Sequence, residues 1–289
     1  MTFGMELITE VERRASEIKM SPEELAKTID HTLLAPYKTT GEFKKLCTEA
    51  KTYDFYAVCV NPYWVSFCSN ELKGTGIKIA AVVGFPLGQT TSKMKALEAR
   101  ETIENGASEV DMVMNIAAFK DQNYEFVKQD IEAVVKVADD TPVKVILETG
   151  YLTYEEIVKA CEISKEAGAS FVKTSTGFGP LGATTMHVYL MRMTVGENFG
   201  VKASGGINNF RDAIRMIAAG ANRIGASDSV KIIDSYRWAR HTSWDIEEIP
   251  CRLCPSRKAS FSKMSKSVFQ YYKMKCVSCP FREFNKFYE

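Results

Sequence analysis

The chain has 289 residues, of which 45% are hydrophobic and 25% are charged, and its formal net charge is +1. A chain of this length can bury one large core and carry a small appendage. Residues 1–20 are charged throughout, and the longest apolar stretch, around residues 77–87, is too short to span a bilayer. We therefore expect a cytoplasmic protein with no membrane partner, whose eight cysteines are reduced or bound to metal.

The charges are unevenly distributed along the chain. Residues 251–289 hold nine Lys and Arg against two Asp and Glu, a net charge of +7, whereas residues 1–250 hold 28 against 34, a net charge of −6. This difference marks the tail as a separate unit. We predict a main domain over residues 1–250, with an N-terminal helix, and a basic tail over residues 251–289.

Short apolar runs rich in Val, Ile and Ala alternate with amphipathic segments ahead of the tail, a pattern typical of βαβ units. Most of these runs are apolar on both faces, as expected of parallel strands that helices cover. We predict eight strands, which begin near Thr28, Phe55, Lys78, Ser108, Val143, Ser170, Gly200 and Arg223.

The predicted helices have recognisable ends. Thr153 with Glu156 forms a capping box after the fifth strand, and Asn209 with Asp212 forms a weaker one after the seventh. In three units a glycine ends the helix just before the next strand. These glycines are Gly106, Gly168 and Gly220.

Eight such units in about 200 residues fit the lower size limit of a (β/α)₈ barrel, the TIM barrel. The alternative is a doubly wound open sheet. No GxGxxG motif follows the first strand, so we do not expect dinucleotide binding. The predicted fold class is α/β, a TIM barrel with a short C-terminal extension that contains four cysteines.

Charged residues inside apolar strands are the candidates for chemistry, since TIM barrels gather catalytic groups at the C-terminal ends of their strands. Asp111, Glu148, Lys173 and Lys202 have this character. A single strand lysine is more often an outward residue that lies between helices. Two lysines near the ends of consecutive strands favour a catalytic role.

Lys173 and Lys202 would repel each other if they were buried together. Repulsion and desolvation lower the pKa of an amine, so that one lysine can attack a carbonyl while the other stays protonated. Asp111 could take and return protons during this reaction, or it could be a structural carboxylate paired with a lysine. The two roles are compatible.

Six segments resemble the successive signature segments of the deoxyribose-phosphate aldolase family, and they cover about residues 27–227 in family order. They are IDHTLL (from Ile29), AVCV (from Ala57), EVDMVMN (from Glu109), VKTSTGFG (from Val172), GATTMHVYLMR (from Gly182) and VKASGGI (from Val201). The resemblance implies reversible cleavage of 2-deoxy-D-ribose 5-phosphate to acetaldehyde and D-glyceraldehyde 3-phosphate, without a cofactor for catalysis. The small-molecule partners would thus be a sugar phosphate and aldehydes.

The resemblance also implies roles for individual residues. Lys173 would be the Schiff-base lysine, Lys202 the lysine that lowers its pKa, and Asp111 the proton-relay carboxylate. Asp30, Thr32 and Thr176 would approach substrate hydroxyls. Cys59 would lie near the site, although a small buried hydrophobic residue is its other interpretation.

A phosphate group needs backbone N–H donors. Gly205 and Gly206 after the seventh strand, and Gly225 to Ser227 after the eighth, can supply them at the standard phosphate position of TIM barrels. The same glycines could simply form tight turns between strand and helix.

Three positions depart from the family pattern. Asn208 replaces a usual arginine, Asp228 a usual serine and Leu181 a common glycine. A carboxylate beside a phosphate weakens binding. The departures therefore predict either lower phosphate affinity or a Schiff-base aldolase that acts on a different or less phosphorylated aldehyde pair.

The tail carries two Cys-x-x-Cys pairs separated by 21 residues. This spacing is close to that of four-cysteine zinc sites, and a segment this short could hardly fold without such a ligand. We favour a structural zinc knuckle, with an iron–sulfur cluster or four unligated thiols as alternatives. The predicted ligands are Cys251, Cys254, Cys276 and Cys279.

Basic and aromatic residues interleave between the two cysteine pairs. Such a segment could bind nucleic acid, but the opposite charges of the two parts favour packing on the acidic barrel or on a neighbouring subunit of a homo-oligomer. We therefore do not expect nucleic acid as a partner. A third functional alternative is a non-catalytic barrel that binds partners through its tail, and the joint presence of Lys173, Lys202 and Asp111 argues against it.

Overall fold

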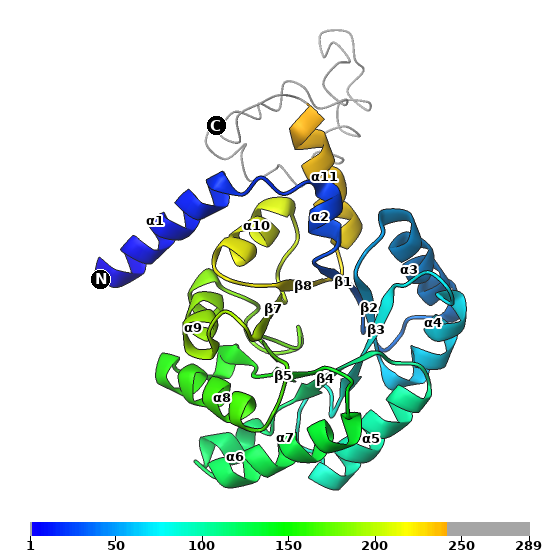
Figure 1. Cartoon of the computed structure of the whole chain (residues 1–289), viewed down its shortest axis with the longest axis vertical. Coiled ribbons are helices and arrows are strands. Elements are labelled where there is room, and N and C mark those ends of the chain that lie inside the picture. The colour runs from blue at the N-terminus through cyan, green and yellow to red at the C-terminus, as the bar shows by residue number, and fades with distance from the viewer. Residues whose placement is uncertain (1, 242–289) are drawn as a thin grey trace, which may run out of the picture. The chain divides into compact units, whose positions relative to one another are not determined.

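A computed structural model of the protein describes residues 2–241. Eight parallel strands close into a barrel in the order β1 to β8, and helices surround it (Figure 1). Closure confirms the TIM barrel and excludes the open sheet, and each strand begins within two residues of its predicted start. The strands are β1 (Ile29–Leu33), β2 (Ala57–Val60), β3 (Lys78–Val83), β4 (Glu109–Val113), β5 (Val143–Ile146), β6 (Phe171–Lys173), β7 (Gly200–Ser204) and β8 (Arg223–Ala226).

Most helices connect one strand to the next, and α1 contacts α9 and α10 on the outside. Two short 3₁₀ helices, η1 (Pro62–Trp64) and η2 (Thr149–Tyr151), follow β2 and β5. The α-helices are α1 (Thr2–Glu17), α2 (Pro22–Ala26), α3 (Thr40–Tyr53), α4 (Val65–Glu71), α5 (Ser92–Glu104), α6 (Ile116–Lys120), α7 (Tyr124–Ala138), α8 (Tyr154–Glu166), α9 (Thr185–Val195), α10 (Phe210–Ala218) and α11 (Ser229–His241).

The predicted helix ends are present. The Thr153 hydroxyl accepts a hydrogen bond from the Glu156 N–H, and the Glu156 carboxylate accepts one from the Thr153 N–H at 2.8 Å. Asn209 caps α10 by accepting a hydrogen bond from the Asp212 N–H at 3.0 Å. The three predicted glycines have a positive φ, and each directly follows the C-cap residue of a helix. They are Gly106, Gly168 and Gly220. These ends bring the chain directly from helix into strand.

The chain divides into two compact units, residues 1–233 and 234–289. Only residues 234–241 of the second unit, the end of α11, are described. The four tail cysteines, Cys251, Cys254, Cys276 and Cys279, lie outside the described residues, so the boundary at residue 250 and the zinc knuckle stay predictions. None of the described helices combines the length and the apolar character that crossing a membrane requires.

One buried ion pair lies outside the barrel, between α5 and α7. The Lys95 Nζ is 2.5 Å from a carboxylate oxygen of Asp130, and both side chains are almost fully buried. Lys95 also donates to the carbonyl of Val113 at 2.9 Å, at the end of β4. The pair therefore connects α5 and α7 to the end of β4. It is a structural ion pair with which the charged groups inside the barrel can be compared.

Candidate active site

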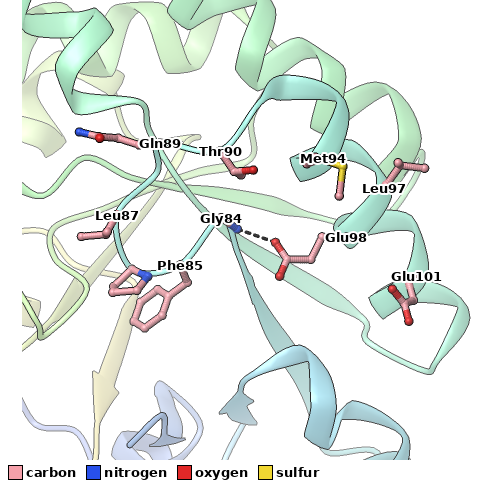
Figure 2. Close-up of a pocket in the computed structure, with 10 residues that line it drawn as sticks. Gly84, Phe85, Leu87, Gln89, Thr90, Met94, Leu97, Glu98 and Glu101 are labelled. Atoms are coloured by element: carbon pink, nitrogen blue, oxygen red, sulfur yellow. Dashed lines mark hydrogen bonds between the residues drawn. The ribbon is translucent and has the colours of Figure 1, made fainter. Parts of the chain in front are cut away.

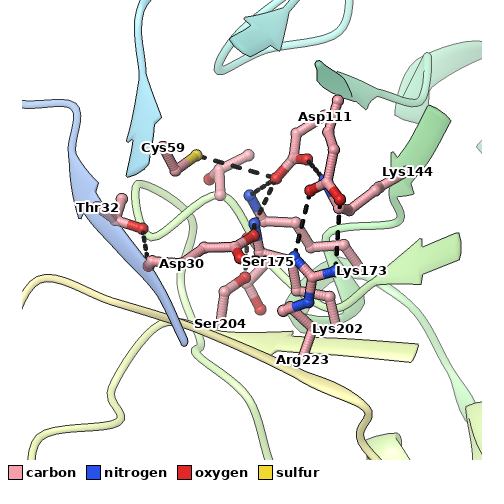
Figure 3. Close-up of polar contacts among 12 residues, drawn as sticks. Asp30, Thr32, Cys59, Asp111, Lys144, Lys173, Ser175, Lys202, Ser204 and Arg223 are labelled. Atoms are coloured by element: carbon pink, nitrogen blue, oxygen red, sulfur yellow. Dashed lines mark hydrogen bonds and ion pairs between the residues drawn. The ribbon is translucent and has the colours of Figure 1, made fainter. Parts of the chain in front are cut away.

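Charged side chains meet inside the barrel (Figure 3). Asp111 comes from β4, Lys173 from β6 and Lys202 from β7, and all three are buried. The strand register pairs Lys173 with Lys202 directly. The three residues predicted to be catalytic therefore form one charged cluster in the barrel interior, where the side chains are usually apolar.

Asp111 is the centre of this cluster. Its Oδ2 atom lies 2.8 Å from the Nζ of both Lys173 and Lys202, and its Oδ1 atom lies 2.7 Å from the Nζ of Lys144. Burial alone would raise the pKa of Asp111, but the three lysines lower it well below its usual range. Asp111 is therefore ionised, and one of its oxygens connects the two lysines.

Lys202 contacts two carboxylates, Asp111 and Asp30, and is fully buried. Burial by itself would lower the pKa of Lys202, but the two carboxylates raise it above the ordinary lysine value. The pKa of Asp30 is lowered in turn, because Lys202 and Arg223 outweigh the effect of burial. These two contacts therefore favour the protonated form of Lys202.

Three further charged residues of this cluster were missed by sequence reasoning: Glu109, Lys144 and Arg223. Lys144 lies 2.7 Å from a Glu109 oxygen as well as from Asp111, and Arg223 lies 2.8 Å from Asp30. Their signal was weak, since each is a single charge near the start of an apolar strand. They extend the network across the barrel and hold the carboxylates of Asp111 and Asp30 in place.

The network has a net charge of +1 when every group carries its usual charge, because it contains three carboxylates and four cations. Loss of one proton from a cation makes it neutral. The carboxylates are Asp30, Glu109 and Asp111, and the cations are Lys144, Lys173, Lys202 and Arg223. Among these cations Lys173 lines the pocket described next, and its amine is therefore the one that can meet a substrate.

A pocket of about 360 Å³ opens at the C-terminal ends of the strands. Lys173 lines it together with six of the predicted substrate-binding residues. Those six residues are Thr32, Thr176, Gly205, Gly206, Gly225 and Ser227. The nucleophile and the glycine-rich loops therefore face the same space.

The two remaining candidates lie just behind the pocket wall. Asp30 contacts Lys202 and Arg223, and its backbone carbonyl accepts a hydrogen bond from the Thr32 hydroxyl at 2.8 Å. The Cys59 Sγ atom is 3.9 Å from Asp111, and burial raises the pKa of this thiol. Cys59 is therefore an un-ionised, buried side chain next to the reacting groups.

The three residues that depart from the family pattern differ in where they lie relative to the pocket. Asn208 lines the pocket, but Asp228 and Leu181 are not among its lining residues. Asp228 lies 3.2 Å from Lys231, and Leu181 packs against Gly150. The Asp228 carboxylate is thus paired with a lysine of α11 and does not line the pocket.

A larger pocket, of about 740 Å³, lies between the end of β3 and α5 and has no catalytic lysine in its wall (Figure 2). There Glu98 accepts a hydrogen bond from the Gly84 N–H at 2.7 Å. The next residue, Phe85, packs against the buried hydrophobic cluster that includes Cys59 and meets Phe178 edge-on, with ring centroids 5.4 Å apart. Phe85, which sequence reasoning missed, therefore brings the β3 loop to the active-site residues.

Comparison with known proteins agrees with this geometry. Residues 24–230 match the DeoC/LacD family aldolase model. The deoxyribose-phosphate aldolase of Clostridium tetani is 59% identical over 212 residues, which are 73% of this chain and 98% of that protein. The chain belongs to the DeoC/LacD aldolase family. It is therefore an aldolase, a carbon–carbon lyase, and the predicted resemblance is confirmed.

Solved structures support the same family. The deoxyribose phosphate aldolase from Aeropyrum pernix, whose structure is described as tetrameric, has a TM-score of 0.75 at 34% identity and covers 79% of this chain and 97% of its own. A putative deoxyribose-phosphate aldolase from Coccidioides immitis has a TM-score of 0.73 at 39% identity, with coverages of 81% and 97%. The family likeness thus includes the whole barrel but not the C-terminal tail.

The raised pKa of Lys202 predicts how stability depends on pH. Because its pKa is higher in the folded than in the unfolded protein, Lys202 contributes stability that is complete below the unfolded lysine value, about 10.4, and is lost as pH rises through the folded value. Lys202→Met should remove this part of the alkaline decline. Urea unfolding of the wild type and of Lys202→Met between pH 8 and about pH 11 measures the two unfolding free energies. Unfolding free energies that fall in parallel with pH would contradict the prediction.

Proposed function

We propose that the chain is a class I aldolase that reversibly cleaves 2-deoxy-D-ribose 5-phosphate to acetaldehyde and D-glyceraldehyde 3-phosphate through a Schiff base on Lys173. The observation that carries the proposal is the shared carboxylate of Asp111. Its Oδ2 atom contacts both the pocket-lining Lys173 and the buried, protonated Lys202. A nucleophilic amine, a proton source and a carrier between them are thus in contact.

The first half of the reaction forms the covalent intermediate. The Lys173 amine attacks the C1 aldehyde of the open-chain sugar, forming a C–N bond while the C=O π electrons move to oxygen. Asp111 accepts the proton that the amine loses and passes it to the oxyanion, which becomes a hydroxyl. A second proton, taken up from water and returned at the final hydrolysis, lets this hydroxyl leave as water. The cation of Lys202 keeps this carboxylate ionised between transfers. The product is a protonated imine.

The second half breaks the carbon–carbon bond. Removal of the C3 hydroxyl proton lets the C2–C3 electron pair move toward the imine nitrogen, which gives an enamine and D-glyceraldehyde 3-phosphate. Protonation of C2 and hydrolysis of the resulting imine release acetaldehyde and restore Lys173. Asp111 is the carboxylate nearest to the nitrogen, at 2.8 Å, and is therefore our candidate for the base.

The phosphate would bind at the glycine-rich end of the pocket. Gly205 and Gly206 follow β7 with positive φ, and Ser227 lies two residues before the start of α11, so that backbone N–H groups can face an anion near a helix N-terminus. Asn208 supplies no charge there, whereas Lys38, which lines the same pocket, pairs with Glu42 at 2.5 Å. This arrangement supports phosphate binding that depends on the backbone.

Borohydride trapping tests the proposal. The purified protein is incubated with 2-deoxyribose 5-phosphate and borohydride, and peptide mass spectrometry then locates the reduced adduct. We expect it on Lys173 and not on Lys144 or Lys202. Unphosphorylated 2-deoxyribose serves as the comparison. Equal trapping of the two sugars would favour the alternative of a less phosphorylated substrate, and no adduct with either sugar or with acetaldehyde would contradict the aldolase mechanism.

Other parts of the proposal rest on the sequence and on one relative. We further propose a cytoplasmic protein with a barrel domain over residues 1–250 and a zinc knuckle formed by the four cysteines of residues 251–289. The Cys-x-x-Cys spacing supports this zinc site. A homo-oligomer is also proposed, which the tetrameric relative supports. Metal analysis and light scattering of the full chain test these two points.

A further inference from the structure

Glu148, singled out by the sequence, is not used by the mechanism above. It follows β5 with φ 53° and ψ 61°, in the left-handed region that non-glycine residues rarely occupy, and only 2% of the residue is exposed. Burial raises the pKa of its carboxyl group, although Thr176 acts in the opposite direction. Burial of the carboxyl group and the left-handed backbone conformation both cost free energy, so the contacts of Glu148 must offset this cost.

Those contacts are with the loop that connects β6 to α9. The Glu148 carboxylate accepts hydrogen bonds from the Thr176 N–H at 3.2 Å and from the Thr176 hydroxyl. The same hydroxyl accepts a hydrogen bond from the Phe178 N–H at 3.0 Å. Glu148 thus determines the position of two loop residues, one directly and one through Thr176.

This loop separates two pockets. Thr176 and Phe178 line both the pocket that contains Lys173 and a neighbouring pocket of about 380 Å³, and Glu148 lines only the second. Glu148 therefore supports the substrate pocket from behind. Gly179 keeps the approach open, since a Cβ atom there would lie 2.7 Å from the Glu148 carboxyl carbon.

We propose that Glu148 is a positioning residue that holds the β6–α9 loop as a wall of the substrate pocket, and that it thereby controls binding of the sugar phosphate more than formation of the Schiff base. The proposal rests on the proposed function. It follows from the direction of the contacts: Glu148 bonds to the wall, whereas Asp111 bonds to the Lys173 amine.

Glu148→Gln tests this role, since it keeps the shape of the side chain and removes its charge. Loss of one charge-assisted hydrogen bond should raise KM for 2-deoxyribose 5-phosphate about tenfold, with kcat changed less than about threefold. The rate of borohydride-trapped adduct formation with acetaldehyde alone should change much less than KM. Glu24→Gln is the control, because Glu24 accepts a backbone hydrogen bond from Ser21 at 2.6 Å on the distant α2.

Two further variants keep the test decisive if Glu148→Gln folds poorly. Gly179→Ala leaves Glu148 intact but displaces its carboxylate, so it should raise KM in the same way. Thr176→Val removes the hydroxyl that connects Glu148 to Phe178, and its effect on KM should be less than additive with that of Glu148→Gln. Melting temperatures identify variants that are merely unstable.

The outcomes separate this inference from the proposed function. Absence of turnover and of an adduct in the wild-type protein would contradict the proposed function itself. Wild-type turnover with an unchanged KM in Glu148→Gln and Gly179→Ala would overturn the positioning role. A parallel fall of kcat and adduct formation, with KM unchanged, would also overturn it, because it would mean that Glu148 supports the fold or the lysine instead of the pocket wall.

Discussion

Lys173→Met should lower kcat/KM for 2-deoxyribose 5-phosphate by at least about 10⁴, because Lys173 is the pocket lysine that contacts Asp111, whereas Lys38, the other lysine in the pocket wall, is paired with Glu42. The same variant should be at least as stable as the wild-type protein. The buried network has four cations for three carboxylates, and Asp111 keeps contacts with Lys144 and Lys202 after the change. Retro-aldol assays and urea unfolding at pH 7.5 measure the two effects.

Lys95→Met is the matched control for this prediction. Lys95 is also a fully buried lysine, but its pair with Asp130 is one-to-one and lies outside the barrel. Its removal leaves an unpaired buried carboxylate, which should cost about 3–5 kcal/mol of unfolding free energy while kcat/KM changes little. Lys173→Met should thus lose activity and keep its stability, whereas Lys95→Met should lose stability and keep its activity. A Lys173→Met protein that still turns over, with an adduct on another lysine, would show that the nucleophile is misassigned.

The fold was predictable because its signals are local. Each strand is a short run of β-branched and apolar residues, and glycines such as Gly106 and Gly168 end helices directly before strands. The boundaries shifted by up to two residues, as with β2, which begins at Ala57 and not at Phe55. Barrel closure then follows from repetition of one unit, since eight parallel strands covered by helices have few other arrangements.

The site was only partly predictable, because its composition depends on register across the barrel. Lys173 and Lys202 stand out at consecutive strand ends, and the structure pairs them. Lys144 and Arg223 were missed, because a charge at the start of a strand looks the same in sequence whether it points inward or outward. Their inward direction is set by pairing with Asp111 and Lys202 on the adjacent strands, which the sequence of a single strand does not reveal.

Asp111→Asn should cause the largest combined loss. Loss of the proton carrier should lower kcat by about 10²–10⁴, and the unfolding free energy should fall by about 3–5 kcal/mol, because buried lysines lose their shared carboxylate. The pKa of Asp111 is lower in the folded than in the unfolded protein, so its contribution is present above about pH 4 and is lost as pH falls through the folded value. The variant should lack this acid-dependent loss.

Asp130→Asn distinguishes the catalytic effect from the structural one. Asp130 is as buried as Asp111, but it pairs with Lys95 between α5 and α7. Its replacement should destabilise the protein by a similar amount, whereas kcat/KM should stay within about threefold of wild type under folding conditions. Equal losses of activity in the two variants would mean that destabilisation accounts for both. A much larger loss in Asp111→Asn would mean that the shared Oδ2 atom, which contacts both Lys173 and Lys202, carries the proton during catalysis.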